Sequence, residues 1–317
     1  MSILKTRSRF LLASAFALAI LPLVIGRENY LLFPLSLVGI YIVVNSGLDV
    51  VYGYCGQISI GQAGFYAIGA YGSALMSLHL EIPVFVSIPT AALLASLAGT
   101  LIAIPSVKLE HHFLAMVTIG FGEIVRLILT NGGGFTGGPD GIRAIPSLKI
   151  GPWNFETNTS YFYLVWGIVL LVLIIKQRLV VSRVGRAFIA IRENPLASQS
   201  FGINNAFYKV LAFTIGAFFA GLGGALYAHL IRFISPESFS LEQSVSFLTM
   251  VLLGGAGSLL GPVFGTTIVF FLFEYLQVFG QAQMAIYGLM IICVLFFMPR
   301  GLIGKLREYF PNLRRFI

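Results

Sequence analysis

The sequence predicts an all-α polytopic integral membrane protein with eight to ten transmembrane helices. Of its 317 residues, 57% are hydrophobic and only 10% are charged, whereas soluble domains average about 45–50% and 25%. The mean hydropathy is +0.91. A helix that crosses the bilayer needs about 20 residues, so ten would occupy about 200 and leave no room for a soluble catalytic domain. This composition excludes a soluble globular protein, a disordered chain and, despite the net charge of +8, a nucleic-acid-binding protein.

Ten apolar runs follow one another along the chain, each bounded by glycine, proline or charge. We expect spans at 10–26, 30–52, 58–78, 83–104, 113–130, 161–178, 208–231, 244–260, 262–279 and 284–298. The first run follows a basic start, as a secretory signal would, but no small-residue cleavage site precedes Arg27, so we expect an uncleaved span. The third run is rich in glycine and polar at its start, and the eighth ends in glycines at 254–257. Both are expected to be broken or re-entrant helices, which are tolerated where protein or water covers the freed backbone.

The basic residues predict the orientation, because cytoplasmic loops of membrane proteins carry an excess of Lys and Arg. Of the 20 basic residues, Arg126 lies inside a span and 19 remain. With the basic start in the cytoplasm, 15 of the 19 fall on that side: Lys5, Arg7, Arg9, Lys108, Lys176, Arg178, Arg183, Arg186, Arg192, Lys209, Arg300, Lys305, Arg307, Arg314 and Arg315. Four fall outside: Arg27, Arg143, Lys149 and Arg232. This distribution favours an even number of spans with both termini cytoplasmic.

The long cytoplasmic connection at residues 183–203 has a helical pattern. Phe188 and Ile191 recur among charged residues, Pro195 can begin a second short helix, and Gly202 can end it. We therefore expect a short amphipathic helix on the cytoplasmic face. The alternative is a basic loop held to anionic membrane lipid, at about 1 kcal/mol for each charge. Composition alone favours the lipid-bound loop over a protein-docking one.

The same loop resembles the coupling loop of permease subunits of ABC importers, which reads E-A-A, three residues, then G. Leu196-Ala197-Ser198 and Gly202 occupy that register, although Leu196 and Ser198 depart from the pattern. Permeases for branched-chain amino acids are more similar, with G-R-x-x-x-A-I-R-E-N before this point and a G-I pair after it. The residues of the loop that carry the resemblance are Gly185, Arg186, Ala190, Ile191, Arg192, Glu193, Asn194, Pro195, Ala197, Gly202 and Ile203.

Four further stretches resemble the same permeases in the same order. They are G-Q-x-S-x-G-x-x-x-F at 56–65, T-G-G-x-x-G-I at 136–142, a late glycine block at 253–262 and P-x-G-L at 299–302. Each is weak alone, but five in order are specific. The resemblance extends from about residue 34 to 304 and is closest to the LivM-type permeases of branched-chain amino-acid ABC importers.

The resemblance implies a permease subunit of an ATP-driven importer in the prokaryotic inner membrane, with leucine, isoleucine or valine as its substrates. It implies as partners a second related permease, two ATP-binding-cassette ATPase subunits and an extracytoplasmic amino-acid-binding protein. Urea and short-amide importers use similar permeases and remain an alternative. The chain has no G-x-x-x-x-G-K-[ST] phosphate loop. We therefore expect a transport subunit and not an enzyme, a single permease domain over 1–317 that binds no cofactor, with ATP hydrolysed by a separate chain.

Gln57, Ser59 and Gln62 are candidates for the substrate pathway. A zwitterion cannot cross hydrocarbon without backbone dipoles and neutral hydrogen-bonding groups, and this glycine-rich segment supplies both. The spacing of five from Gln57 to Gln62 requires a break near Gly61 if the two amides are to converge. The alternative is that the small residues let helices pack closely and the amides bond to neighbouring helices.

The second group of pathway candidates lies in an external turn, at Gly138, Asp140 and Gly141. This turn could contact an incoming binding protein or gate the pathway. A plain structural turn explains the same residues equally well, because Pro-Asp-Gly favours a tight bend and Asp140 is a common turn residue.

Few other side chains are candidates for chemistry. Glu123 and Arg126 form an i,i+3 pair in the fifth span, where pairing offsets the cost of burying charge, and they are either functional or a satisfied core contact. Glu274 would be the titratable acid of an ion-coupled secondary transporter. No metal site is expected, because the four histidines have no carboxylate or cysteine at ligand spacing. Cys55 and Cys293 are far apart, so a disulfide framework is not expected either.

Overall fold

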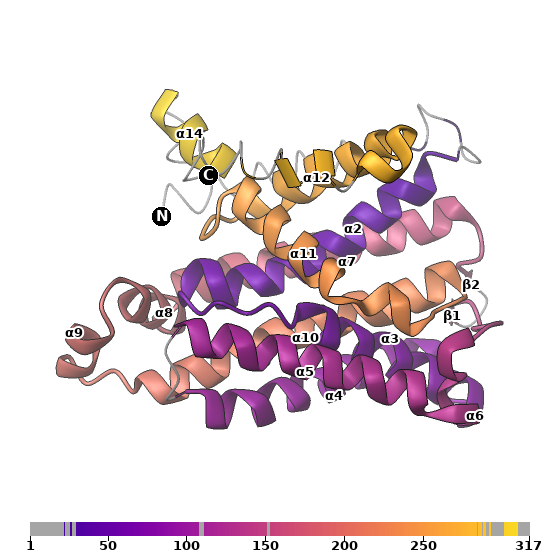
Figure 1. The fold of residues 1–317 in the computed structure, drawn as a ribbon, viewed down its shortest axis with the longest axis horizontal. Helices are drawn as coiled ribbons and strands as arrows, with labels where there is room; N and C mark the ends of the chain where they lie inside the picture. Colours follow the sequence, from indigo (N-terminus) through magenta and orange to yellow (C-terminus); the bar gives the residue numbers. More distant parts are fainter. Residues whose placement is uncertain are drawn as a thin grey trace.

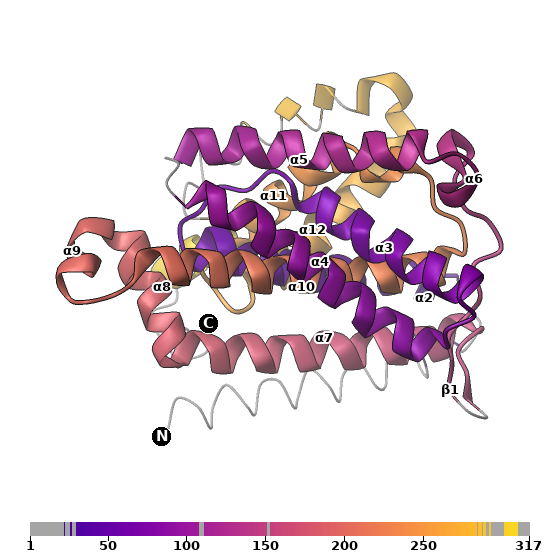
Figure 2. The same ribbon diagram turned by 90° about the horizontal axis from the view of Figure 1, so that it is seen from below.

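The computed structural model describes residues 30–107, 111–150, 153–283 and 301–309, with single positions at 22, 26, 285, 286, 288, 289 and 292. Over this part of the chain, long helices run side by side in a bundle (Figures 1 and 2). The predicted spans 10–26 and 284–298 lie almost wholly outside the described residues. So do Arg27, Lys108, Cys293, residues 299–300 of the P-x-G-L stretch, and the basic residues before position 22 and after 309.

The elements follow one another in a simple order. The first half contains α2 (Leu32–Asp49), the π-helix η1 (Val50–Tyr54), α3 (Gln62–His79), α4 (Val84–Ser106), α5 (His111–Asn131), α6 (Gly133–Thr136) and the 3₁₀ helix η2 (Gly138–Asp140). A hairpin of β1 (Lys149–Ile150) and β2 (Trp153–Asn154) leads into α7 (Asn158–Val181), α8 (Arg183–Glu193), α9 (Pro195–Ser200) and α10 (Asn205–Ile231). The last part contains η3 (Pro236–Phe239), α11 (Leu241–Gly254), α12 (Gly261–Leu276), η4 (Gln277–Ala282) and α14 (Gly301–Tyr309).

Six helical segments among the described residues are long and apolar enough to cross a membrane: Leu32–Tyr54, Val84–Ser106, Phe113–Asn131, Asn158–Val181, Asn205–Ile231 and Gly261–Gly280. They coincide with six of the predicted spans. The all-α prediction is confirmed for this part of the chain, where the only strands are the two of the short hairpin. The third predicted span contains α3, which is polar at its start, and the eighth contains α11, which has only 14 residues.

The core of the bundle is centred on α10, which packs against α2, α3 and α4. Glycines permit the closest approaches. A Cβ atom on Gly69 of α3 would overlap the carbonyl of Gly221 in α10, and one on Gly224 would overlap the carbonyl of Tyr66. Small residues at a helix contact let two backbones touch, as is common between membrane helices.

Neither the third nor the eighth predicted span is helical along its whole length. Residues 55–61 belong to no helix, and α3 begins only at Gln62. At the other break, α11 ends at Gly254, and Gly255 and Gly257 have φ values of 110° and 73°, in a region that favours glycine. The chain then enters α12 at Gly261, so α11 and α12 form a tight helical hairpin.

One assignment from the charge count is wrong. Lys176 was counted among the basic residues outside the span interiors, on the cytoplasmic side, but it lies inside α7 and its side chain is fully buried. The cation is accommodated inside the helix because it has an ion-pair partner in the bundle, Asp49 of α2, at 2.7 Å. The remaining residues of the loop begin after the helix ends, at Ser182.

Candidate functional site

Residues 183–203 form two short helices that project from one end of the bundle, which we call the α8 end (Figures 1 and 2). Ser182 ends α7 and begins α8, because its Oγ accepts hydrogen bonds from the N–H groups of Val184 and Gly185. Asn194 does the same for α9: its Oδ1 accepts from the N–H groups of Leu196 and Ala197, both at 3.0 Å. Pro195 is the first residue of α9 and Gly202, with φ of 79°, follows its end. The predicted second helix is therefore present.

The two helices differ in how they contact the bundle. The apolar face of α8 is buried, with Phe188 and Ile191 packed against η1 and α10. By contrast, α9 is tied down mainly through polar bonds, since the amide of Asn205 donates to the carbonyl of Pro195 at 2.8 Å. Leu196 and Phe201 remain 78% and 86% exposed. We call these two residues the α9 tip.

The other predicted coupling residues shape this region in different ways. A Cβ atom on Gly185 would overlap the last carbonyls of α7, and Arg186 donates to the carbonyl of Val181 at 2.9 Å. Arg192 forms an ion pair with Glu193 at 2.7 Å and also donates to the carbonyl of Gly53 in η1. Of the remaining three, Ala197 is exposed, and Ala190 and Ile203 are half-buried.

Gln57, Ser59 and Gln62 lie along and after the break, but they do not converge. The amide of Gln62 points into the core, where Nε2 donates to the carbonyls of Val44 and Gly216, each at 3.4 Å. This geometry agrees with the alternative that the amide bonds to neighbouring helices and does not line the pathway. Gln57 and Ser59 are also buried, yet Gln57 Oε1 and Ser59 Oγ have no hydrogen-bond partner in the structure. These two polar atoms are therefore available to a ligand or to water.

Gly138, Asp140 and Gly141 lie at the opposite end of the bundle, which we call the α6 end. The extended segment meets α5 at Thr118, whose Oγ1 accepts from the N–H of Ile60, and from there to Asn131 the helix rises about 20 Å. The structure thus separates the two groups of pathway candidates. Gly138 is buried, Asp140 is exposed, and a Cβ atom on Gly141 would overlap the carbonyl of Ile234. The turn is packed tightly against the segment that precedes η3.

The predicted pair of Glu123 and Arg126 forms, with Arg126 Nη2 2.5 Å from Glu123 Oε1. The side chains are 43% and 31% exposed on the face of α5, so this is not a core contact. Glu123 also lines a cavity of about 180 Å³ between α3, α5 and α11, together with Ala63 and Ser244. A half-exposed ion pair in the middle of a membrane-spanning helix is costly in hydrocarbon. The face of α5 that carries it therefore suits water or protein better than lipid.

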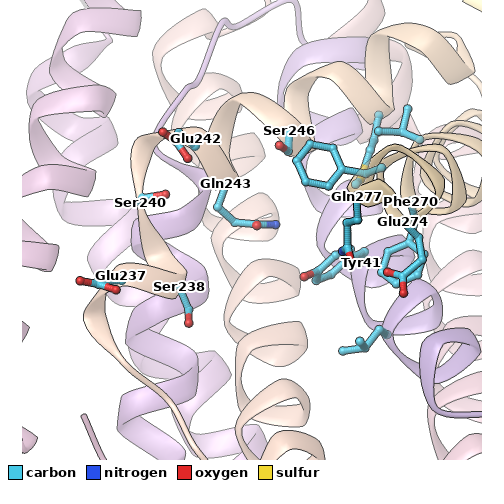
Figure 3. Close-up of a pocket in the computed structure, with 14 residues that line it drawn as sticks. Tyr41, Glu237, Ser238, Ser240, Glu242, Gln243, Ser246, Phe270, Glu274 and Gln277 are labelled. Atoms are coloured by element: carbon cyan, nitrogen blue, oxygen red, sulfur yellow. The ribbon is translucent and has the colours of Figure 1, made fainter. Parts of the chain in front are cut away.

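A larger cleft of about 340 Å³ lies between α2, η3, α11 and α12 (Figure 3). Its polar lining residues are Tyr41, Glu237, Ser238, Ser240, Glu242, Gln243, Ser246, Glu274 and Gln277. In Figure 3, Gln243 and Tyr41 reach toward the middle of the cleft, with Glu237 on one side and Glu274 on the other. Ser240 lines both this cleft and the smaller cavity, so the two adjoin.

Two groups of residues escaped the sequence analysis. Asp49 and Lys176 form a buried pair at the α8 end, and nothing in the sequence links two residues so far apart. Phe201 of the α9 tip could have been noted as an aromatic residue beside the Gly202 helix end. No cluster of three metal-ligating side chains occurs among the described residues. His229 is a hydrogen-bonded core residue, 2.8 Å from Ser73 Oγ and 2.7 Å from the carbonyl of Pro146.

Sequence comparison decides the family. The profile of the branched-chain amino acid transport system permease component matches residues 30–295. The chain belongs to this family. It is therefore a multi-pass membrane permease component, and the sequence resemblance noted above is confirmed.

Several named relatives align over most of the permease. The high-affinity branched-chain amino acid transport system permease protein LivM of Salmonella typhimurium is 34% identical over 96% of this chain and 76% of its own length. LivM of Escherichia coli K12 is also 34% identical, over 97% and 77%. The permease protein LivH of the same organism is 28% identical over 84% of this chain and 91% of its own. No solved structure is significantly similar to the permease.

Proposed function

We propose that this permease is a subunit of an ATP-driven importer of leucine, isoleucine and valine, and that a separate subunit hydrolyses the ATP. The α9 tip is the observation that carries the proposal. Leu196 and Phe201 are large apolar side chains, 78% and 86% exposed, in and directly after a short helix that projects beyond the bundle. Aromatic anchors of this kind dominate the binding energy of protein interfaces. In the proposal, residues 183–203 are the coupling loop, and the tip inserts into the ATPase subunit.

The proposed orientation places the α8 end in the cytoplasm and the α6 end outside. The order of elements supports it: α5 and α10 end at the α6 end, where Ile142 pairs with Ile234, and the turn between α11 and α12 lies beside Arg192 at the α8 end. Together with α3 and α11, the six apolar helices make eight crossings. The runs at 10–26 and 284–298 would raise the number to ten. Both numbers put the two termini on the same side of the membrane. Because α2 ends at the α8 end and α14 begins there beside Gly255, we favour ten spans, with both termini in the cytoplasm.

The proposed substrate pathway runs along the face formed by α5, the start of α3 and α11. Non-helical backbone such as residues 55–61 is not stable against lipid. Together with the exposed ion pair of α5 and the two adjoining cavities, this supports a water-filled path covered by a second permease. Gln57 and Ser59 would offer their free polar atoms to the substrate near the cytoplasmic side. The turn at 138–141 would contact the binding protein outside.

The proposed assembly contains this chain, a second related permease, two ATPase subunits and an extracytoplasmic amino-acid-binding protein in a prokaryotic inner membrane. Similarity to both LivM and LivH of one organism supports a paralogous second permease. We propose that this chain binds no cofactor or metal itself. Importers of urea or short amides are the alternative, because substrate choice would rest with the binding protein.

Affinity purification from native membranes in mild detergent, followed by mass spectrometry and an ATPase assay, tests the proposal. We expect recovery of a second permease and an ATPase. Alanine at Arg192, Glu193 and Asn194 should abolish recovery of the ATPase, because it removes the cap of α9 and the contact to η1. The matched control replaces three charged residues of the other end, Arg143, Lys149 and Glu156, with alanine and should retain the ATPase. Purification of the chain alone, without nucleotide hydrolysis, would overturn the proposal.

A further inference from the structure

A buried ion pair fastens three elements of the bundle together at the α8 end. Lys176 Nζ of α7 lies 2.7 Å from Asp49 Oδ2 at the end of α2, and neither side chain is exposed. Asp49 Oδ1 accepts a hydrogen bond from the N–H of Gly257 at 2.7 Å, and Lys176 also donates to the carbonyl of Ser258 at 3.3 Å. Gly257 and Ser258 belong to the turn between α11 and α12. One pair of charges therefore holds α2, α7 and this turn.

Arg192 connects the projecting helix α8 to the same point. Its guanidinium donates to the carbonyl of Gly53 in η1. A Cβ atom on Gly257 would lie 2.7 Å from that carbonyl oxygen and 2.8 Å from Arg192 Nη1. A Cβ atom on Gly56 would lie 2.7 Å from Arg192 Cγ. The guanidinium thus reaches η1 only because glycines line its path.

The elements that meet here are those that a coupling device needs to join. The π-helix η1 leads directly into the non-helical segment 55–61. Turns of π-helix are rare in proteins as a whole, and those that occur are often at functional sites. Helix α7 leads into α8 through Ser182 alone, so the position of α8 depends on α7. Stability is a weak explanation for the pair, because the desolvation of two buried charges offsets much of their attraction.

We propose that Asp49, Lys176 and Arg192 form a positioning link that transmits movement of α8 to segment 55–61 and to the α11–α12 turn. The link makes the cytoplasmic part of the pathway open in step with the ATPase. This inference rests on the proposed function, since it requires an ATPase docked at residues 183–203. It adds two residues, Asp49 and Lys176, that lie outside that loop and outside the pathway.

The test uses the complete complex in proteoliposomes and measures substrate uptake and ATP hydrolysis on the same sample. The variant Asp49→Asn/Lys176→Met removes both charges but keeps an amide oxygen for the Gly257 N–H and a long apolar chain in α7. We expect ATP hydrolysis to persist while the uptake for each ATP falls at least tenfold. A merely structural pair would lower both activities together with the amount of assembled complex. The control Lys149→Met/Glu156→Gln removes a solvent-exposed lysine–carboxylate pair at the α6 end and should leave the ratio unchanged.

A second variant keeps the inference testable if the double variant fails to assemble. Gly257→Ala places a methyl group against Arg192 and Gly53, and we expect it to lower the uptake for each ATP at least fivefold. Gly133→Ala is its control, because Gly133 also has positive φ but no atom lies within 4 Å of its Cβ position. If both test variants take up as much substrate for each ATP as the wild type does, the link is rejected. If neither test variant assembles while both controls do, the link is also rejected, because the residues would then have only a structural role. If the wild-type complex shows no ATP-driven uptake, the proposed function itself is rejected.

Discussion

Replacing Phe201 with alanine should weaken the attachment of the ATPase subunit without destabilising the permease. The ring is 86% exposed and has few contacts to lose within the chain. Complete burial of a phenylalanine side chain contributes about 1.5–3 kcal/mol. Because most of the ring remains to be covered, we expect a loss of about 2 kcal/mol, which corresponds to a roughly 30-fold rise in Kd. Leu196→Ala should have a similar but smaller effect, since leucine is the smaller side chain and is 78% exposed.

The assay is titration of the purified permease with the ATPase subunit in detergent, with the thermal unfolding midpoint measured on the same preparations. Phe135→Ala is the matched control, because this ring is also exposed but lies at the α6 end, stacked on His79. It should leave the Kd unchanged. An equal Kd for Phe201→Ala and the wild type would refute the docking role of the α9 tip. A fall in the unfolding midpoint for Phe201→Ala would show that the ring is packed in the free chain.

Three further results are expected. Gly69→Ala should lower the free energy of unfolding by about 1–3 kcal/mol, because its methyl group overlaps the backbone of α10. The control Gly167→Ala should not, because no atom lies within 4 Å of the added Cβ, and equal thermal unfolding midpoints for the two variants would contradict this. In a Cys293→Ser background, Cys55 should resist labelling by a maleimide at pH 7.5, because burial raises the pKa of its thiol to about 12 and the thiolate is the reactive form. Labelling of the protein before denaturation would count against the packing of α8 on η1. Glu274→Gln should leave uptake within about twofold of the wild type, since ATP drives transport; abolished uptake would favour the ion-coupled transporter.

The positions of the helices along the chain could be predicted from the sequence where a single local property determined them. Apolar runs of sufficient length gave α2, α4, α5, α7, α10 and α12, and glycines marked the breaks before α3 and after α11. Pro195 and Gly202 marked the limits of α9 because each has a backbone preference that acts locally. The π-helix at Val50–Tyr54 could not be predicted, because its residues are as apolar as those of the helix it continues.

The candidate site was less predictable, because it depends on contacts between distant segments. Lys176 was counted as a cation outside the span interior, since its partner Asp49 is in another helix and only the fold brings them together. Gln57 and Gln62 look equivalent in the sequence, but the amide of Gln62 is bonded to carbonyls of α2 and α10 while Gln57 Oε1 has no partner. Exposure also depends on the fold: the i,i+3 spacing of Glu123 and Arg126 predicted their pairing but not their position on an open face of α5.

Uptake by proteoliposomes tests the central claim most directly. The complex that co-purifies with the permease is reconstituted with ATP inside the vesicles, and radiolabelled leucine is added outside together with the binding protein. We predict accumulation that requires both ATP and the binding protein and that unlabelled isoleucine and valine inhibit. Accumulation driven by a proton or sodium gradient without ATP would contradict the account, and ATP-dependent accumulation of urea with no leucine uptake would contradict its assignment of substrate.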